Sequence, residues 1–193
     1  MDSLPRKDLY LAGFVVAIFT YMTLIALSEK AGFLYAELPL ELLICCALAL
    51  IFPEPGLGLG WGKKAVSVMA LMTIGLCAVW TLGFWYWESH SSNFDRDWRL
   101  IFPLLSLVVT KPWLEEKLLR HMLLTSLTGM AGPVISSILV SIFFAVAHKG
   151  VMLWAFIVSL ALCWIRFRFK AKTAHCVVVH GLINAYVLVL YML

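Results

Sequence analysis

The chain has 193 residues, of which 63% are hydrophobic and 13% charged, and its mean hydropathy is +0.94. A soluble domain averages about 45–50% apolar and about 25% charged residues, so this composition excludes an ordinary soluble protein and indicates an integral membrane protein. The formal net charge of +4 is spread over predicted loops and does not form the concentrated basic surface of nucleic-acid-binding proteins. We therefore expect a lipid bilayer as a partner and no nucleic acid.

Long apolar runs in the first half of the chain predict membrane-spanning helices. A span needs about 20 apolar residues, and only helices and closed barrels satisfy the backbone in lipid. The expected spans cover residues 8–28, 34–52 and 65–87. A loop rich in proline and glycine at 53–64 separates the second from the third, and a polar segment follows at 88–99. The first run lacks a small-residue cleavage site, so we expect a retained helix.

The second half of the chain predicts shorter helices. Residues 100–110 are apolar but short, and Pro112 is expected to break or kink any helix that runs through it. Further helices are expected at 113–127, 134–148, 151–167 and 174–193, and Gly129, Gly132 and Pro133 end the first of these. The total is seven or eight helices, depending on the effect of Pro112.

These elements predict an all-α, polytopic transmembrane bundle. We expect a single integral membrane domain over 1–193, with N-terminal helices in 1–99 and a core in 100–193. The core helices are too short for simple spans, which favours short, tilted helices around a cavity within the membrane.

Basic residues predict the orientation in the membrane, because loops on the cytoplasmic side carry an excess of lysine and arginine. One set of predicted helix ends carries Arg6, Lys7, Lys63, Lys64, Arg166, Arg168, Lys170 and Lys172. The opposite set carries only Lys30, Arg96, Arg99 and Lys149. The N-terminus is therefore expected on the cytoplasmic side.

The first polar motif in this core is Glu115-Glu116-Lys117-Leu118-Leu119-Arg120. Glu116 and Arg120 are four residues apart, so on a helix they share one face and can form an ion pair. Glu115 projects about 100° away and is left free to act on a water molecule. The alternative is a solvated charge cluster at a helix end, and this motif by itself does not decide between the two.

Two further motifs place histidines in apolar surroundings. Phe144 precedes His148 by one turn and can pack beside its ring, although a single histidine at a helix end is more often an interface residue. His180 and Asn184 are also four residues apart, so their polar tips point the same way. Such a pair can donate hydrogen bonds to an oxyanion, or it can simply join two membrane helices.

Taken together, the three motifs resemble those of the CPBP family, which comprises CAAX proteases and bacteriocin-processing enzymes and is also called the ABI family. The family's type II CAAX prenyl endopeptidases carry EExxxR, FxxxH and HxxxN or HxxxD in this order. The matches here are Glu115-Glu116-Arg120, Phe144-His148 and His180-Asn184, within residues 111–187. His121 departs from the pattern, because members often have glycine after the arginine.

The resemblance implies a glutamate-dependent intramembrane endopeptidase, in which all six of these polar residues belong to the catalytic site. Glu115 would activate a water molecule with help from His148. His180 and Asn184 would stabilise the oxyanion, and Arg120 would hold Glu116 in the framework. The zinc motif HExxH is absent and the histidines lie on separate predicted helices, so we expect neither a metal nor another cofactor.

The expected substrate is a protein or peptide that enters from the membrane or the cytoplasmic side and is cut near a C-terminal tail or a membrane segment. Because bacterial members of the family are linked to bacteriocin maturation and immunity, the expected location is a bacterial inner membrane. The sequence leaves a prenylated tail, a bacteriocin leader and another tail open as substrates. The same polar residues also suit a non-catalytic immunity or scaffold protein, or a proton-coupled carrier.

Glu37 and Glu41 form one more pair of acidic residues with a spacing of four. Two charged carboxylates at that spacing repel each other on one helix face. We expect both near the membrane interface, and lining a substrate portal is the alternative.

Overall fold

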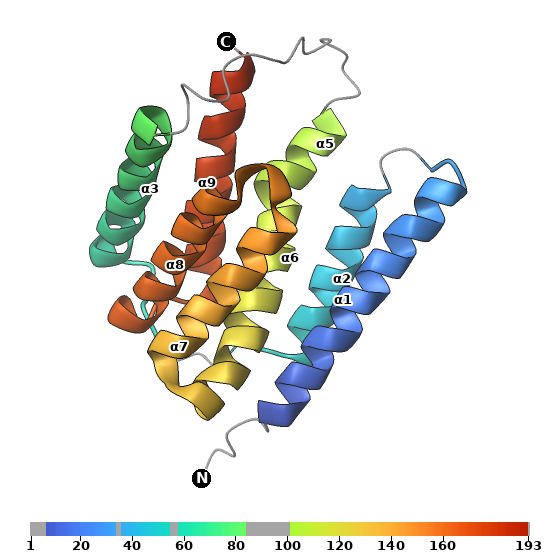
Figure 1. Ribbon diagram of the computed structural model, residues 1–193, viewed down its shortest axis with the longest axis horizontal. Coiled ribbons are helices and arrows are strands. Elements are labelled where there is room, and N and C mark those ends of the chain that lie inside the picture. Colours follow the sequence, from blue (N-terminus) through green and yellow to red (C-terminus); the bar gives the residue numbers. More distant parts are fainter. Residues whose placement is uncertain (1–6, 34–35, 55–57, 84–100, 193) are drawn as a thin grey trace.

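The computed structural model describes residues 7–33, 36–54, 58–83 and 101–192, and within these ranges the chain forms helices and no strand (Figure 1). The all-α prediction is confirmed. The helices are α1 (Lys7–Lys30), α2 (Glu37–Ile51), α3 (Lys63–Gly83), α5 (Ile101–Leu105), α6 (Lys111–Glu116), α7 (Leu124–Ala147), α8 (Met152–Phe169) and α9 (Thr173–Met192).

The number of helices differs from the sequence prediction. Helical structure continues from Ile101 to Ala147, because π-helical stretches at Ser106–Thr110 and Lys117–Leu123 join α5, α6 and α7. The described ranges thus contain six helical segments, one of which is broken at Gly132, and the expected seven or eight helices are not confirmed. Within the longest segment, Gly132 leaves the helical conformation, with φ 79° and ψ 169°. The chain reverses direction there (Figure 1), as its glycines and proline predicted.

Pro112 does not split its helix, and the adjacent π-helical turn explains why. The N–H of Lys111 donates to the carbonyl oxygen of Ser106, five residues earlier. The next bond in that register would run from residue 112 to the carbonyl of Leu107, but proline has no N–H to donate. The helix therefore continues with a carbonyl group that has lost its helical partner. This carbonyl becomes part of the candidate site described below.

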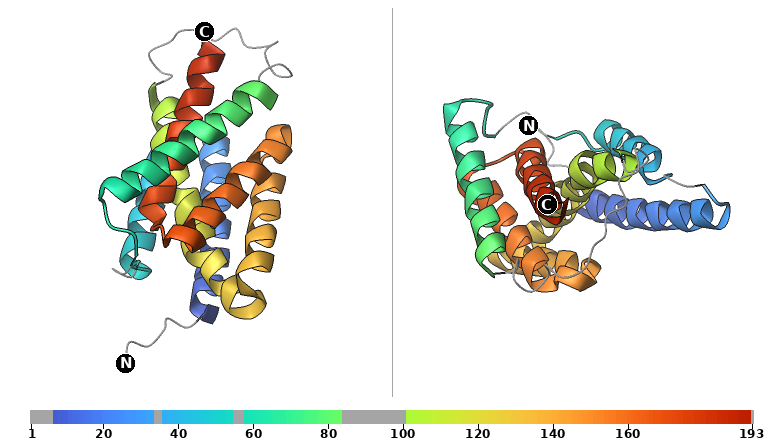
Figure 2. Two further views of the ribbon diagram at one scale, coloured as in Figure 1. Left: turned by 90° about the vertical axis from the view of Figure 1, so that its left-hand side faces the viewer. Right: turned by 90° about the horizontal axis from the view of Figure 1, so that it is seen from above.

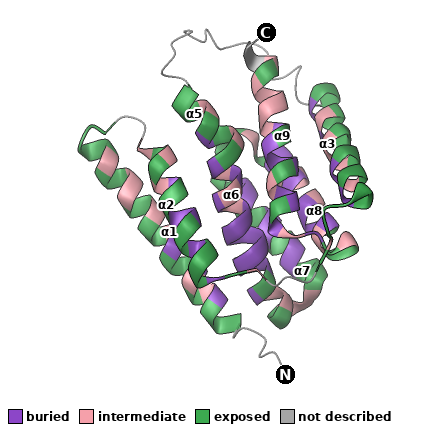
Figure 3. Ribbon diagram, turned by 180° about the vertical axis from the view of Figure 1, so that it is seen from behind, coloured by how far each residue is buried: buried purple, intermediate pink, exposed green. Residues whose placement is uncertain are grey.

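The helices pack as a bundle around the segment that contains α5, α6 and α7. Viewed along the bundle, α1 and α2 lie at one end, α3 lies at the other, and α5 to α9 lie between them (Figure 2). Buried side chains form one apolar cluster around α1, α2, α6 and α7 and a second around α3, α8 and α9. Burial is concentrated in the central helices, whereas α1 and α3 are largely exposed (Figure 3).

The exposed outer surface is apolar, as expected for a protein in contact with lipid. Phe19, Leu71 and Val134 are each about 70% exposed, at 69%, 70% and 71%. Five helical segments in the described part of the chain are long and apolar enough to cross a membrane. They are Lys7–Lys30, Lys63–Gly83, Ile101–Ala147, Lys149–Phe169 and Thr173–Leu190.

The basic residues on which the predicted orientation rests lie, where the structure describes them, at the two ends of the bundle. The starts of α1 and α3 and the end of α8 lie at one end, with Lys7, Lys63 and Arg168 (Figure 1). Lys30 and Lys149 lie toward the other end. Arg6, Arg96, Arg99 and the expected polar segment 88–99 lie outside the described residues.

A carboxylate in the loop after α2 fixes the start of α9. Both side-chain oxygens of Glu54 accept a hydrogen bond from the backbone N–H of Thr173, at 3.0 and 3.1 Å. Arg166 lies 3.0 Å from the same carboxylate. Burial raises the pKa of the Glu54 carboxyl. The Arg166 guanidinium and the hydrogen bonds from Thr173 lower it by more than burial raises it, so that the pKa lies below its ordinary value. Glu54 therefore stays charged and holds α9 against the end of α8.

We predict that Gly132→Ala destabilises the protein. The backbone conformation of Gly132 is accessible almost only to glycine, and forcing another residue into it costs about 1–3 kcal/mol. The free energy of unfolding in detergent micelles should fall by that amount. The matched control is Gly75→Ala in α3, where an added Cβ has no neighbour within 4 Å, and it should not destabilise. Equal effects of the two substitutions would contradict the break at Gly132.

Candidate active site

The predicted ion pair between Glu116 and Arg120 is present at the centre of the bundle. Arg120 Nε lies 3.1 Å from Glu116 Oε2, and both side chains are 0% exposed. This burial overturns the alternative of a solvated charge cluster. An unpaired charge in an apolar interior costs several kcal/mol, so neither residue can be buried here without the other.

Arg120 also binds the two helices that follow it. Its Nη2 donates to the backbone carbonyl of Ser159 in α8, at 3.3 Å. Its guanidinium carbon lies 5.3 Å from the ring centre of Phe144 in α7, within the range of a cation–π interaction. Arg120 thereby fixes α7 and α8 relative to the glutamates.

His180 brings α9 into the same network. Its Nδ1 lies 2.9 Å from Glu116 Oε1, so that Glu116 binds Arg120 with one oxygen and His180 with the other. The second ring nitrogen of His180, Nε2, lies 3.7 Å from Glu115 Oε2. The His180 ring therefore lies between the two adjacent glutamates.

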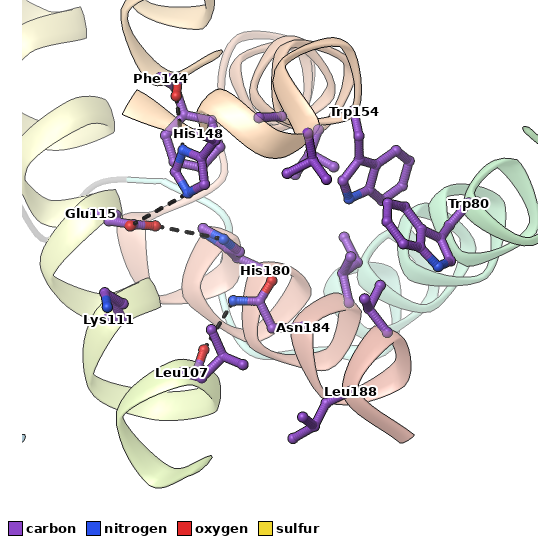
Figure 4. Close-up of a pocket in the computed structure, with 15 residues that line it drawn as sticks. Trp80, Leu107, Lys111, Glu115, Phe144, His148, Trp154, His180, Asn184 and Leu188 are labelled. Carbon is purple, nitrogen blue, oxygen red and sulfur yellow. Dashed lines mark hydrogen bonds and ion pairs between the residues drawn. The ribbon is translucent and has the colours of Figure 1, made fainter. Parts of the chain in front are cut away.

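Glu115 lies between the two histidines, at the edge of a cavity (Figure 4). Its Oε1 is 3.9 Å from His148 Nε2 and its side chain is 23% exposed. His148 Nδ1 lies 2.8 Å from the carbonyl oxygen of Phe144. Because a carbonyl only accepts hydrogen bonds, Nδ1 carries a proton, and Nε2 is the ring nitrogen that faces Glu115. The Phe144 ring packs 4.2 Å from the His148 ring, as the sequence predicted.

Asn184 binds a backbone group that the sequence analysis did not identify. Its Nδ2 donates to the carbonyl of Leu107 at 2.9 Å, the same carbonyl that Pro112 leaves without a helical partner. One turn earlier in α9, a Cβ on Gly181 would collide with the carbonyl oxygen of Val108. Gly181 thus permits the close approach of a backbone, and α9 lies directly on the π-helical stretch.

The cavity has a volume of about 380 Å³ and lies between the two apolar clusters. Its polar lining consists of Lys111, Glu115, His148, His180 and Asn184, and its apolar lining includes Trp80, Trp154, Val158, Ile183 and Leu188. Four of the six predicted site residues, Glu115, His148, His180 and Asn184, line the cavity, and the other two, Glu116 and Arg120, are buried behind its wall. In the described ranges, no group of three or more His, Cys, Asp or Glu side chains is arranged to hold a metal ion.

Trp80 is a lining residue that sequence reasoning missed. It belongs to α3, outside the motif-bearing core, and its ring lies 5.2 Å from that of Trp154. The sequence contains eight tryptophans, and nothing in the spacing of Trp80 sets it apart.

The interpretation of Glu41 as an interfacial or portal residue was wrong. Glu41 is 0% exposed and accepts hydrogen bonds from the hydroxyl groups of Tyr21, Ser106 and Thr110. It joins α1 and α2 to the π-helical stretch. Glu37, one turn away, is exposed and pairs with Lys111 at 3.2 Å.

His121, the residue that departs from the family pattern, packs away from the cavity. It is 2% exposed, and its ring lies 5.2 Å from that of Tyr10 in α1. The departure therefore affects the contact between α1 and the motif-bearing segment and leaves the lining of the cavity unchanged.

The fold and the site define a class of protein: a polytopic, helical integral membrane protein with an acid–histidine site beside an internal cavity. Residues 97–186 match the family model described as type II CAAX prenyl endopeptidase Rce1-like. The resemblance inferred from the three motifs is thereby confirmed, and at the level of the family it indicates a protease. No curated protein and no solved structure matches the chain.

We predict that Arg120→Met destabilises the protein strongly. The substitution leaves Glu116 buried without its partner, which costs about 3–5 kcal/mol. The measurement is the free energy of unfolding in detergent micelles. Arg168→Met, at an exposed position in α8, is the matched control and should change it by less than about 0.5 kcal/mol. The double variant Arg120→Met/Glu116→Met should recover most of the loss. A single variant as stable as the wild type would contradict the role of this pair.

Proposed function

We propose that the protein is an intramembrane endopeptidase in which Glu115 activates a water molecule. One observation carries this proposal: Glu115 lies between His148 and His180 at the edge of a largely apolar cavity, 3.9 and 3.7 Å from their Nε2 atoms. Its neighbour Glu116 is committed to Arg120 and His180. Glu115 is therefore the carboxylate that can reach a substrate.

The distance between Glu115 and His148 suits a water molecule. Glu115 Oε1 accepts hydrogen bonds, and the facing Nε2 of His148 accepts one when Nδ1 alone carries the ring proton. At 3.9 Å they are too far apart for a direct hydrogen bond, and a water can mediate contacts of this length. A water that donates one hydrogen to each acceptor keeps its lone pairs for a carbonyl carbon.

The proposed reaction is a hydrolysis that needs no further reagent. Glu115 takes a proton from the water as its oxygen bonds to the scissile carbonyl carbon, and the carbonyl oxygen becomes an oxyanion. His180, through Nε2–H, and Asn184, through its second Nδ2 hydrogen, then donate to that oxyanion. The proton on Glu115 passes to the leaving nitrogen, the C–N bond breaks, and a carboxylic acid and an amine are released.

The remaining motif residues act as positioning groups in this proposal. Glu116 holds the His180 ring through Nδ1, and Arg120 compensates the charge of Glu116. Leu107 orients the Asn184 amide through its carbonyl. A catalytic constellation of this kind must be held within about 0.5 Å of its productive geometry, and the buried network supports such precision.

We further propose a bacterial inner membrane as the location, with a cytoplasmic N-terminus. The basic residues at the α1 end of the bundle support this orientation. The substrate is a protein or peptide that reaches the cavity from the membrane or the cytoplasmic side. A non-catalytic immunity or scaffold protein would retain its activity without a water-activating glutamate. A proton-coupled carrier that uses the same polar residues would instead show ion-dependent uptake of a substrate into proteoliposomes.

We predict that Glu115→Gln abolishes cleavage while the protein still folds. Loss of a general base lowers turnover by about 10²–10⁴, and His148→Ala should fall in the same range. The measurement compares peptide termini, by mass spectrometry of membrane fractions, between cells with the wild type and cells with the variant. Glu29→Gln, at an exposed position of α1, is the matched control and should process the same substrates as the wild type. Unchanged processing by Glu115→Gln would overturn the proposal.

A further inference from the structure

Two loops that are far apart in the sequence meet at the end of the bundle where α3 begins and α8 ends (Figure 1). The backbone N–H of Leu59 donates to the carbonyl oxygen of Lys170 at 2.9 Å. A Cβ on Gly58, whose φ is 142°, would lie only 2.9 Å from the same oxygen. The loop before α3 therefore packs this closely because it has glycine at that position, and the two loops form one continuous surface.

Aromatic side chains are fixed on this surface. The Trp61 ring is 62% exposed and stacks on the buried ring of His175, with the ring centres 4.3 Å apart. Trp164 of α8 is also exposed, and its ring packs edge-on against that of Phe169 at 5.3 Å. Tryptophan favours the headgroup level of a bilayer. These rings therefore indicate that the surface lies at the boundary between membrane and water.

Four exposed cations lie on the same surface. Lys63 and Lys64 begin α3, and Arg168 and Lys170 lie at the end of α8. Among the described residues, no carboxylate lies within ion-pair distance of any of the four. Glu54, the acidic residue of the adjoining loop, is already bound to the start of α9. Four positive charges without an acidic partner in the described chain thus face the headgroup layer.

Lys170 has a backbone conformation that disfavours lysine. Its φ of 52° and ψ of 39° are left-handed, and within the described ranges it is the only residue other than glycine with a positive φ. Glycine most often ends a helix in this way, because it has no Cβ. A cation also favours the end of a helix dipole, but Arg166 and Arg168 in the last turn already supply that charge. Strain of this kind is concentrated at functional sites.

We propose that this surface binds the headgroup of an anionic phospholipid. The residues that form it are Trp61, Lys63, Lys64, Trp164, Arg168 and Lys170. The lysine amines and the guanidinium would donate to the lipid phosphate, as in other charge-assisted hydrogen bonds. The acyl chains would lie along the exposed apolar side chains of α3, among them Val66 and Leu71.

A lipid fits this surface better than a soluble anion does. A soluble anion would use the amines alone, whereas a lipid would also contact the exposed rings and the apolar side of α3. The cytoplasmic leaflet is anionic, and each cation near it contributes about fivefold to affinity. The proposed cytoplasmic position of this end of the bundle therefore agrees with an anionic lipid. This binding is independent of the proposed peptidase activity.

The test uses the full-length protein in nanodiscs of phosphatidylcholine that contain a variable fraction of phosphatidylglycerol. Bromine on the acyl chains of either lipid quenches a tryptophan in contact with it. The chain has eight tryptophans, so the difference between the wild type and Trp61→Phe isolates the fluorescence of Trp61. We expect brominated phosphatidylglycerol to quench Trp61 at a mole fraction at least about fivefold lower than brominated phosphatidylcholine does, as for one cation or more.

Three variants separate this surface from net charge. Lys170→Gly relieves the left-handed backbone and removes one cation, so the thermal unfolding midpoint should not fall while the preference for phosphatidylglycerol drops by about fivefold. Lys63→Gln/Lys64→Gln removes two cations and should lower the preference as well. The matched control is Lys30→Gln/Lys149→Gln, which removes the same charge from exposed lysines toward the opposite end of the bundle. It should keep the wild-type preference.

Four outcomes would overturn the inference. The wild type could be quenched equally by the two brominated lipids, or Lys170→Gly could retain the preference. The Lys30→Gln/Lys149→Gln control could lose as much as Lys63→Gln/Lys64→Gln does, in which case net charge attracts the lipid. Excess inorganic phosphate at constant ionic strength could abolish the preference, in which case the amines bind a soluble anion.

Discussion

The packing of the central helices depends on one buried ion pair, between Glu116 and Arg120, whose charges no water molecule can solvate. Glu116 and Arg120 are both fully buried, and in an apolar bundle each is tolerated only with partners in fixed places. Those partners are a backbone carbonyl of α8, an aromatic ring of α7 and the His180 ring of α9. The requirement therefore fixes three helices relative to one turn of the motif-bearing segment. Because Glu115 directly precedes Glu116 on the same helix, its side chain then points toward the cavity.

Much of this site was readable from spacing, because interactions four residues apart are local properties of a helix. Glu116 with Arg120 and Phe144 with His148 followed from that rule alone. The meeting of Glu115 with histidines from two other helices did not, and it was expected only from the resemblance. Asn184 was predicted as a site residue, but its acceptor was not, because that acceptor is the backbone carbonyl of Leu107, which the π-helical register before Pro112 leaves available.

The fold was predictable to the same extent. Apolar runs and the glycines near residue 132 located the helices and the reversal. The continuation through Pro112 was not foreseen, because sequence patterns assume α-helical hydrogen bonding, and a change of register removes the conflict that proline creates. Glu37 and Glu41 illustrate the same limit. The spacing of four gives no reason to treat the two residues differently, yet Glu37 is exposed and Glu41 is fully buried. The hydroxyl groups that surround Glu41 come from distant parts of the chain, so a local pattern does not reveal them.

The cavity wall is shared unequally between the two halves of the chain. Every group that the proposed mechanism uses comes from the C-terminal half, whereas Trp80 in the apolar part of the wall comes from α3. An N-terminal helix can thus exchange side chains along this wall without disturbing the buried charges. For a protein with the proposed activity, the shape of this apolar wall can then differ between related proteins while the polar residues of the site stay the same.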